Sequence, residues 1–335
     1  MKSFIRVITS INLILTFVTL MPASAHAAPL NFFVATNGSD KNPGTLQKPF
    51  KTIQHCVSSR PGNSTCNVRA GNYFETVVPT SSGLTVQSYN NEKVTLDSRK
   101  SVTGFKQYAP NKYVAKVTLP LGDDNQIFFN DTSGILAMWP NTTDLLHPNW
   151  ERIPNEISPE NLLTDSQIPS GLSGTGSIKF FSGDDAWTSQ TGSFDNPQSG
   201  NLHFTLDGAS TGIYITPAKN GLYYLFNNIA FLDTAYEWFY NPTESKLFVQ
   251  IPSGSNINNF KISYKSKETL VDLRGSAHVT IKNISLFGGT IAMDEQSQGN
   301  LIDGINANYV SNNTRSYDNT TTHNWAHGNS TIVRL

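Results

Sequence analysis

The sequence predicts an all-β protein that contains a parallel β-helix, and three observations lead to this fold class. Short runs of β-forming residues, such as "LTVQSY", "KLFVQIP" and "HVTIKNISLFGG", are separated by Asn, Gly and Ser along most of the chain. Helical periodicity is nearly absent outside residues 49–57, where Phe50, Ile53 and Val57 fall on one face. A repeat with a period of 21 residues lies near the end of the sequence.

The repeat consists of the segments "HVTIKNISLFGG" and "GNLIDGINANYV". Three pairs of apolar residues are each 21 positions apart: Ile281 and Ile302, Ile284 and Ile305, Leu286 and Ala307. Copies that stack apolar residues on apolar residues at this period are typical of parallel coils. We interpret "NSTIVRL", residues 329–335, as a third partial copy. The repeat alone leaves a β-sandwich with chance similarity as the alternative.

The first residues have the pattern of a secretion signal. Lys2 and Arg6 precede an apolar run at 7–21, and "PASAHAA" supplies Ala-x-Ala cleavage sites. The alternative is a membrane anchor, which needs about 20 apolar residues. Because the run is shorter and ends in a cleavage-like site, we expect a secreted or periplasmic protein that begins near Ala28. After cleavage we expect no association with a membrane.

Cys56 and Cys66 are the only cysteines in the chain, and they flank a Pro-Gly-Asn turn. Thiols outside the cytosol oxidise, so we expect a structural disulfide between them. A redox pair or a metal site is disfavoured by the spacing and by the absence of further ligands nearby.

Composition excludes several functions. Only 15% of the residues are charged and the net charge is −1, so the sequence has no basic surface for nucleic acid or for an anionic membrane. Once the signal is removed, the chain is long for one compact core, which favours two domains or a solenoid.

The opening of the mature chain resembles the N-terminal coil of secreted β-helix proteins of the pectin-lyase-like superfamily. The resemblance covers residues 32–78 and is carried by "FFVATNGSDKNPGTLQKPFKTIQ" and "VRAGNYFE". It implies a right-handed parallel β-helix with a short helix over the open end of the first coil, held to the first strand by Cys56 and Cys66. The segments "LAMWPN" and "LDTAYEWFYNPTESKLFVQIP" resemble a β-rich insertion of some β-helix glycoside hydrolases.

These observations predict four parts. Residues 1–27 form the signal peptide, and 28–99 form the N-terminal cap and first coil. Residues 100–265 form the inserted β-rich subdomain, and 266–335 form further coils. Because "STIVRL" ends the sequence without a cap, we expect the coils to be incomplete and some catalytic residues to lie beyond Leu335.

The candidate site lies in and before the loop 311–329. Asp303 follows Ile302 on a predicted strand, so its side chain points away from the core. We predict that Asp303, Asp318 and His323 are catalytic and share one exposed face, with Arg315, Trp325 and His327 binding the substrate. The alternative interpretation is a solvent loop with incidental charges.

We expect no cofactor. "HNWAH" lacks the glutamate of the zinc motif HExxH. Calcium is an open alternative if Asp294 and Glu295 gather with Asp303.

The predicted function is that of a secreted protein, acting as a monomer on an extracellular polysaccharide or oligosaccharide. A glycoside hydrolase needs two carboxyl groups, whereas a lyase or epimerase needs a base and cations beside a uronate. The other hypothesis is a non-catalytic β-helix that binds glycans, or an inactive truncated relative.

Overall fold

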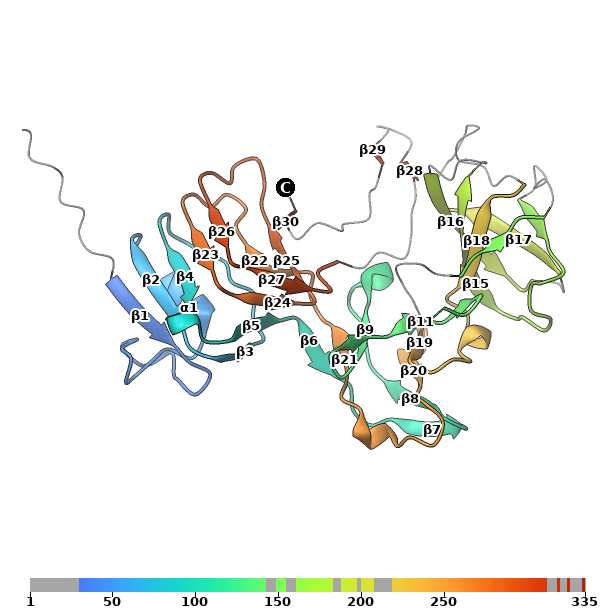
Figure 1. The fold of residues 1–335 in the computed structure, drawn as a ribbon, viewed down its shortest axis with the longest axis horizontal. Helices are drawn as coiled ribbons and strands as arrows, with labels where there is room; N and C mark the ends of the chain where they lie inside the picture. The colour runs from blue at the N-terminus through green and yellow to red at the C-terminus, as the bar shows by residue number, and fades with distance from the viewer. Residues whose placement is uncertain are drawn as a thin grey trace, which may run out of the picture.

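The computed structural model describes residues 30–142, 149–154, 161–182, 188–197, 200–207 and 219–311, together with the strand residues 318–319, 324–325 and 333–334. The fold is predominantly β, as the sequence predicts (Figure 1). None of the helices in these residues has the length and apolar content needed to cross a membrane. The predicted signal peptide lies outside the described residues.

Three sheets at one end of the molecule are parallel throughout (Figure 1). The first contains β1 (Leu30–Val34), β2 (Ser64–Val68), β4 (Thr85–Ser88), β23 (Thr280–Lys282) and β26 (Leu301–Asp303). The second contains β3 (Gly71–Tyr73), β5 (Val94–Asp97), β24 (Ser285–Phe287) and β27 (Asn306–Asn308). The third contains β22 (Thr269–Asp272), β25 (Thr290–Ala292) and β30 (Val333–Arg334).

The predicted offset of 21 residues is the register of these sheets. Ile281 pairs with Ile302 in the first sheet, and Leu286 pairs with Ala307 in the second. Ile281 and Leu286 are fully buried and belong to one apolar core between the sheets. In the segment interpreted as a third partial copy, β30 pairs with β25 and so belongs to the third sheet.

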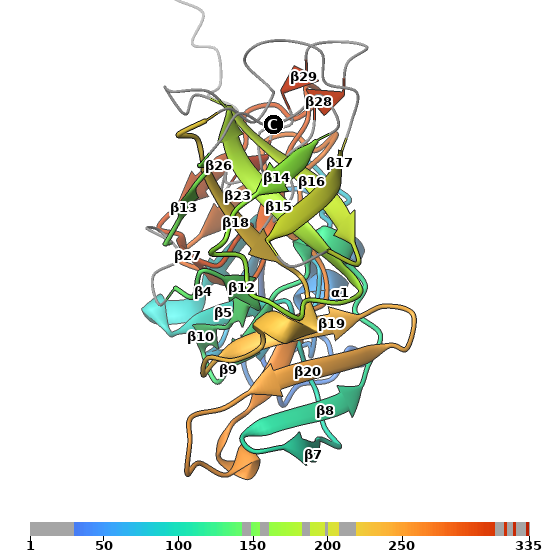
Figure 2. The same cartoon turned by 90° about the vertical axis from the view of Figure 1, so that its right-hand side faces the viewer.

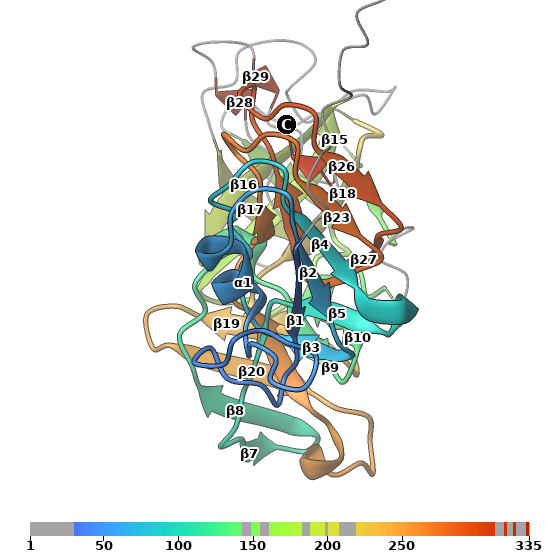
Figure 3. The same ribbon diagram turned by 90° about the vertical axis from the view of Figure 1, so that its left-hand side faces the viewer.

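The helix α1 (Ile53–Ser59) lies beside β1 and β2 at the outer end of the parallel sheets (Figure 3). The predicted disulfide between Cys56 and Cys66 is confirmed and links α1 to β2. Our prediction of a helix from residue 49 was wrong at its start. The Thr52 side chain accepts a hydrogen bond from the His55 N–H and so acts as the N-cap.

The chain between β5 and β22 forms three antiparallel or mixed sheets. Four strands lie next to the parallel sheets: β6 (Arg99–Ser101), β9 (Ile127–Phe129), β10 (Thr132–Ser133) and β21 (Ile262–Lys265). Five strands form the next sheet: β7 (Lys106–Ala109), β8 (Lys112–Lys116), β11 (Ile135–Leu136), β19 (Glu237–Asn241) and β20 (Lys246–Gln250). The strands β19 and β20 form an antiparallel hairpin around "NPTES".

A seven-stranded sheet lies beyond them, and Figure 2 shows it above β19 and β20. Its strands are β12 (Met138–Trp139), β13 (Glu151–Arg152), β14 (Leu162–Thr164), β15 (Thr175–Ser182), β16 (Thr188–Asp195), β17 (Asn201–Leu206) and β18 (Leu222–Phe226). One face of this sheet packs into its own apolar core, which includes Ile178, Phe180, Tyr223 and Leu225. The remaining strand pair joins β28 (Asp318–Asn319) to β29 (Asn324–Trp325).

Candidate functional site

Asp303 lies on β26 with its side chain exposed, as strand alternation predicts. Its carboxylate lies 3.2 Å from Lys282 Nζ on the adjacent strand, and both side chains are nearly half exposed, at 48% and 44%. The column continues through Gln87 to Asn67, whose side chains share a hydrogen bond of 2.9 Å. A row of polar groups therefore follows the stacking direction of the first sheet, nearly half exposed at Asp303 and Lys282, partly buried at Gln87 and buried at Asn67.

The rest of the predicted site is placed only in part. The backbone of Asp318 pairs with that of Trp325, which brings these two positions together. Arg315, His323 and His327 lie outside the described residues. The grouping of Asp303 with Asp318 and His323 therefore stays a prediction.

Asp294 and Glu295, considered above for calcium, lie in the turn after β25. The Asp294 carboxylate accepts hydrogen bonds from the backbone N–H groups of Gly275 and Gln296, at 2.9 and 3.1 Å. These bonds hold the pKa of Asp294 below its usual value. Among the residues that the structure describes, no group of three or more His, Cys, Asp and Glu side chains is gathered as a metal would require.

A pair of carboxyl groups lies where the parallel sheets meet the four-stranded sheet. Asp124, in the 3-10 helix η2 (Gly122–Asp124), shares a hydrogen bond with Glu268, which precedes β22. Burial of Asp124, together with this bond and the charge of Glu268, raises the pKa of Asp124 to about 7. The positive charge of Lys265 acts in the opposite direction.

This pair does not have the geometry of the two carboxyls of a glycosidase. Those groups stand about 5–5.5 Å apart in retaining enzymes and about 6.5–9.5 Å apart in inverting enzymes, with the sugar between them. Asp124 and Glu268 are in direct hydrogen-bonding contact, which leaves no room for a sugar. Lys265 cannot act as the base of a lyase, because it is only 1% exposed and donates to the Val310 carbonyl.

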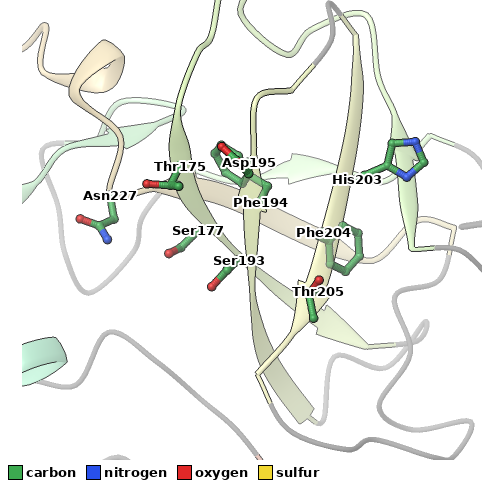
Figure 4. Close-up of a pocket in the computed structure, with 10 residues that line it drawn as sticks. Thr175, Ser177, Ser193, Phe194, Asp195, His203, Phe204, Thr205 and Asn227 are labelled. Carbon is green, nitrogen blue, oxygen red and sulfur yellow. The ribbon is translucent and has the colours of Figure 1, made fainter.

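A second feature is an open hollow of about 710 Å³ on the seven-stranded sheet (Figure 4). Ser177, Ser193 and Thr205 lie opposite one another on three adjacent strands, so their hydroxyl groups form a row. The other lining residues are Thr175, Gly176, Phe194, Asp195, His203, Phe204 and Asn227.

A smaller hollow of about 360 Å³ lies between this sheet and the five-stranded sheet. Trp238, Tyr240 and Phe226 contribute aromatic rings, and Asp123 and Asn125 of the η2 turn contribute polar groups. Asn227 lines both hollows.

Sequence reasoning missed both the carboxyl pair and the two hollows. Asp124 and Glu268 are far apart in the sequence, and no local motif marks either residue. The hydroxyl row had a signal, since polar residues alternate with apolar ones in "TGSIKF", "TGSFD" and "NLHFTL".

Comparison with known proteins shows a similar fold but does not assign the chain to a family. No model of a known protein family matches the chain. Among curated proteins, an uncharacterized protein YwoF of Bacillus subtilis (strain 168) is 36% identical over 83 residues, which is 23% of this chain and 18% of YwoF.

Among solved structures, a glycoside hydrolase superposes with a TM-score of 0.57 and 17% identity, over 77% of this chain and 50% of the hydrolase. A complex of XylC with xylose gives a TM-score of 0.41 and 13% identity, over 82% of this chain and 41% of XylC. The chain thus spans about half the length of the solved glycoside hydrolase whose fold it shares.

Proposed function

We propose that the protein is a secreted, carbohydrate-active protein of the glycoside hydrolase type, acting on an extracellular glycan. The observation that carries this proposal is the fold, since 77% of the chain superposes on a glycoside hydrolase with a TM-score of 0.57. The hydrolytic activity is proposed for the whole protein, because the chain spans half of that enzyme.

In this proposal the three parallel sheets belong to a right-handed β-helix. The support is that the chain contributes strands to the sheets in turn and that equivalent apolar residues pair at an offset of 21 positions. The proposed division is a cap and first coil at 28–99, an insertion at 100–265 and further coils at 266–335. The disulfide and the apolar run at 7–21 support export of the protein.

The proposed substrate surface is the outer face of the first sheet, which carries Asp303. Neighbouring strands lie about 4.8 Å apart, so polar side chains along a column are spaced to meet successive groups of a polymer. Asp303 is proposed as one catalytic carboxylate, with Asp318 and His323 completing the site. Asp124 is not included, because its partner carboxyl is too close for this chemistry.

The test is to incubate the protein, produced from the whole natural gene, with neutral polysaccharides and with polyuronates. The expected result is new reducing ends without unsaturated products. Unsaturated uronates, detected by ultraviolet absorbance, would overturn the hydrolase and indicate a lyase. Binding of a glycan without any product would indicate the non-catalytic alternative.

A further inference from the structure

We propose that the hollow on the seven-stranded sheet is a binding site for a neutral saccharide, separate from the proposed catalytic face on the parallel sheets. The hollow lies on β15, β16 and β17, whereas Asp303 lies on β26 of another sheet. The inference concerns binding alone and does not depend on hydrolysis.

The polar lining of the hollow follows from strand alternation. Thr175 and Ser177, Ser193 and Asp195, and His203 and Thr205 occupy alternate positions on their strands and share one face. The residues between them include Phe194 and Phe204, which also line the hollow and are buried in the apolar core of the sheet. Ser177 is completely buried, but the other five side chains are exposed, so with the partly exposed Asn227 the hollow offers hydroxyl, carboxylate, imidazole and amide groups.

Gly176 allows this floor to form. A Cβ atom at this position would lie 2.2 Å from the Phe194 ring, so the ring packs directly across the glycine backbone. A side chain at position 176 would displace the Phe194 ring, which packs in the apolar core beneath Ser193 and Asp195. The relative positions of the lining groups are thus fixed by core packing.

The charge of the lining selects a neutral ligand. Among the lining residues Asp195 carries a negative charge, and none is a lysine or arginine. Phosphate, sulfate and uronate ligands need cationic partners, so they are disfavoured here. A volume of about 710 Å³ is within the range of small-molecule sites, and hydroxyl-rich ligands match a lining of hydrogen-bonding groups.

A peptide is disfavoured by the sheet topology. Peptides that bind sheets usually add a strand to a free edge. The hollow lies on a face, and β16 is flanked by β15 and β17, while β17 is flanked by β14 as well. The backbone groups beneath the hollow are therefore committed to the sheet, and recognition must use side chains.

The shared residue Asn227 indicates the shape of the ligand. It lines both the hydroxyl-lined hollow and the smaller one, where the Tyr240 ring is partly exposed and Trp238 is buried in the core. Sugar rings present hydroxyl edges and flat carbon–hydrogen faces, so a linear oligosaccharide can use hydroxyl groups in one hollow and the Tyr240 ring in the other. We therefore assign the site to a neutral oligosaccharide of several rings.

The test is isothermal titration calorimetry of the full chain with xylotriose, cellotriose and mannotriose, and with trigalacturonate as an anionic probe. Two exposed lining residues are replaced together by isosteric ones, Asp195→Asn and Thr205→Val. The matched control is Thr164→Val, an exposed threonine on the edge strand β14 that does not line the hollow.

The expected result is that at least one neutral trisaccharide binds and that the double variant binds it about tenfold more weakly, because a charge-assisted hydrogen bond is lost. Thr164→Val should bind as the original chain does. The proposal is overturned if no neutral trisaccharide binds, if the double variant keeps full affinity, or if trigalacturonate binds more tightly. Hydrolysis measured on the same samples keeps the two proposals apart. If the double variant loses trisaccharide binding but retains hydrolysis, the catalytic face is not the sole saccharide site, and the proposed function stands.

Discussion

Asp124 and Glu268 share a hydrogen bond between their carboxyl groups, and this bond joins the η2 turn to the segment that leads into β22. One proton held between two carboxyls relieves their mutual repulsion. We therefore expect the contact between the parallel sheets and the sheets formed between β5 and β22 to depend on pH.

The first prediction concerns stability against pH. Asp124 keeps a proton up to about pH 7 in the folded chain, whereas the unfolded chain releases it near 3.8. The folded state binds more protons in this window, so its free energy of unfolding falls as pH rises. Since Asp124 is partly exposed, we expect a loss of about 1–2 kcal/mol, well below the value for full burial.

Urea unfolding between pH 4 and pH 8 measures this loss. Asp124→Asn should remove the contribution of Asp124 to the slope of unfolding free energy against pH. Asp123→Asn, at the exposed neighbouring residue, should retain that slope. An identical slope in the original chain and in Asp124→Asn would contradict the prediction.

The second prediction concerns Glu237, which is completely buried at the start of β19. Its carboxylate accepts the backbone N–H groups of Asp233 and Thr234, at 2.9 and 2.8 Å. Burial raises the pKa of Glu237 to about 7 even though these bonds oppose the shift. Glu237→Ala should lower the free energy of unfolding by about 2–3 kcal/mol, because two N–H donors lose their acceptor.

Glu237→Gln should cost less than Glu237→Ala, because the amide oxygen can still accept both N–H groups. Glu244→Ala, at the exposed tip of the same hairpin, is the control and should change stability little. Equal losses for the alanine and glutamine variants would show that charge, and not the acceptor oxygen, stabilises this turn.

A feature of the structure could be predicted from the sequence only as far as it depends on a local pattern of residues. The pairing of Ile281 with Ile302 was predictable, because parallel strands that stack in register must place apolar residues at equal spacing. The start of α1 has a local signal in its N-cap Thr52. Ile53 and Gln54 also donate their N–H groups to Glu75, and no pattern near the helix indicates this contact.

The candidate site shows the same limit. The exposure of Asp303 followed from alternation along one strand. The contact of Asp124 with Glu268 forms only because the chain leaves the parallel sheets after β5 and returns to them at β22. No spacing of residues within either segment indicates that the chain returns to the parallel sheets.

The third prediction concerns the disulfide, whose two cysteines are completely buried. The link closes a loop with a sequence separation of 10. By loop entropy, Cys56→Ser with Cys66→Ser should lower the free energy of unfolding by about 2–3 kcal/mol. Urea unfolding with and without a reductant measures this, and a reductant that destabilises the double variant as much as the original chain would contradict it.

The fourth prediction concerns Arg99, which ties the parallel sheets to the four-stranded sheet. Its guanidinium pairs with Asp97 of β5 at 2.8 Å and with Asp131 at 2.7 Å, and lies 3.8 Å from the Phe287 ring centroid. Because Asp97 is only 1% exposed, Arg99→Ala should cost about 2–4 kcal/mol by leaving its carboxylate unpaired. Arg99→Lys should recover only part of the lost stability, since lysine lacks the planar guanidinium that binds a carboxylate through two N–H groups.

Thermal melts compare the two Arg99 variants with Arg274→Ala. This control removes an exposed arginine paired with Asp272 and should leave the melting temperature unchanged.

The last prediction concerns Asp303 and rests on the proposed function. Its ion pair with Lys282 is nearly half exposed on both sides, and such pairs contribute about 0–1 kcal/mol. Asp303→Asn should therefore leave the melting temperature almost unchanged. If this carboxylate acts in the reaction, the same substitution should abolish glycan hydrolysis, because an amide can neither accept a proton nor attack the sugar. Glu295→Gln, an exposed carboxylate in the turn after β25, is the matched control and should keep full activity. Full hydrolysis by Asp303→Asn would remove the outer face of the first sheet as the catalytic surface.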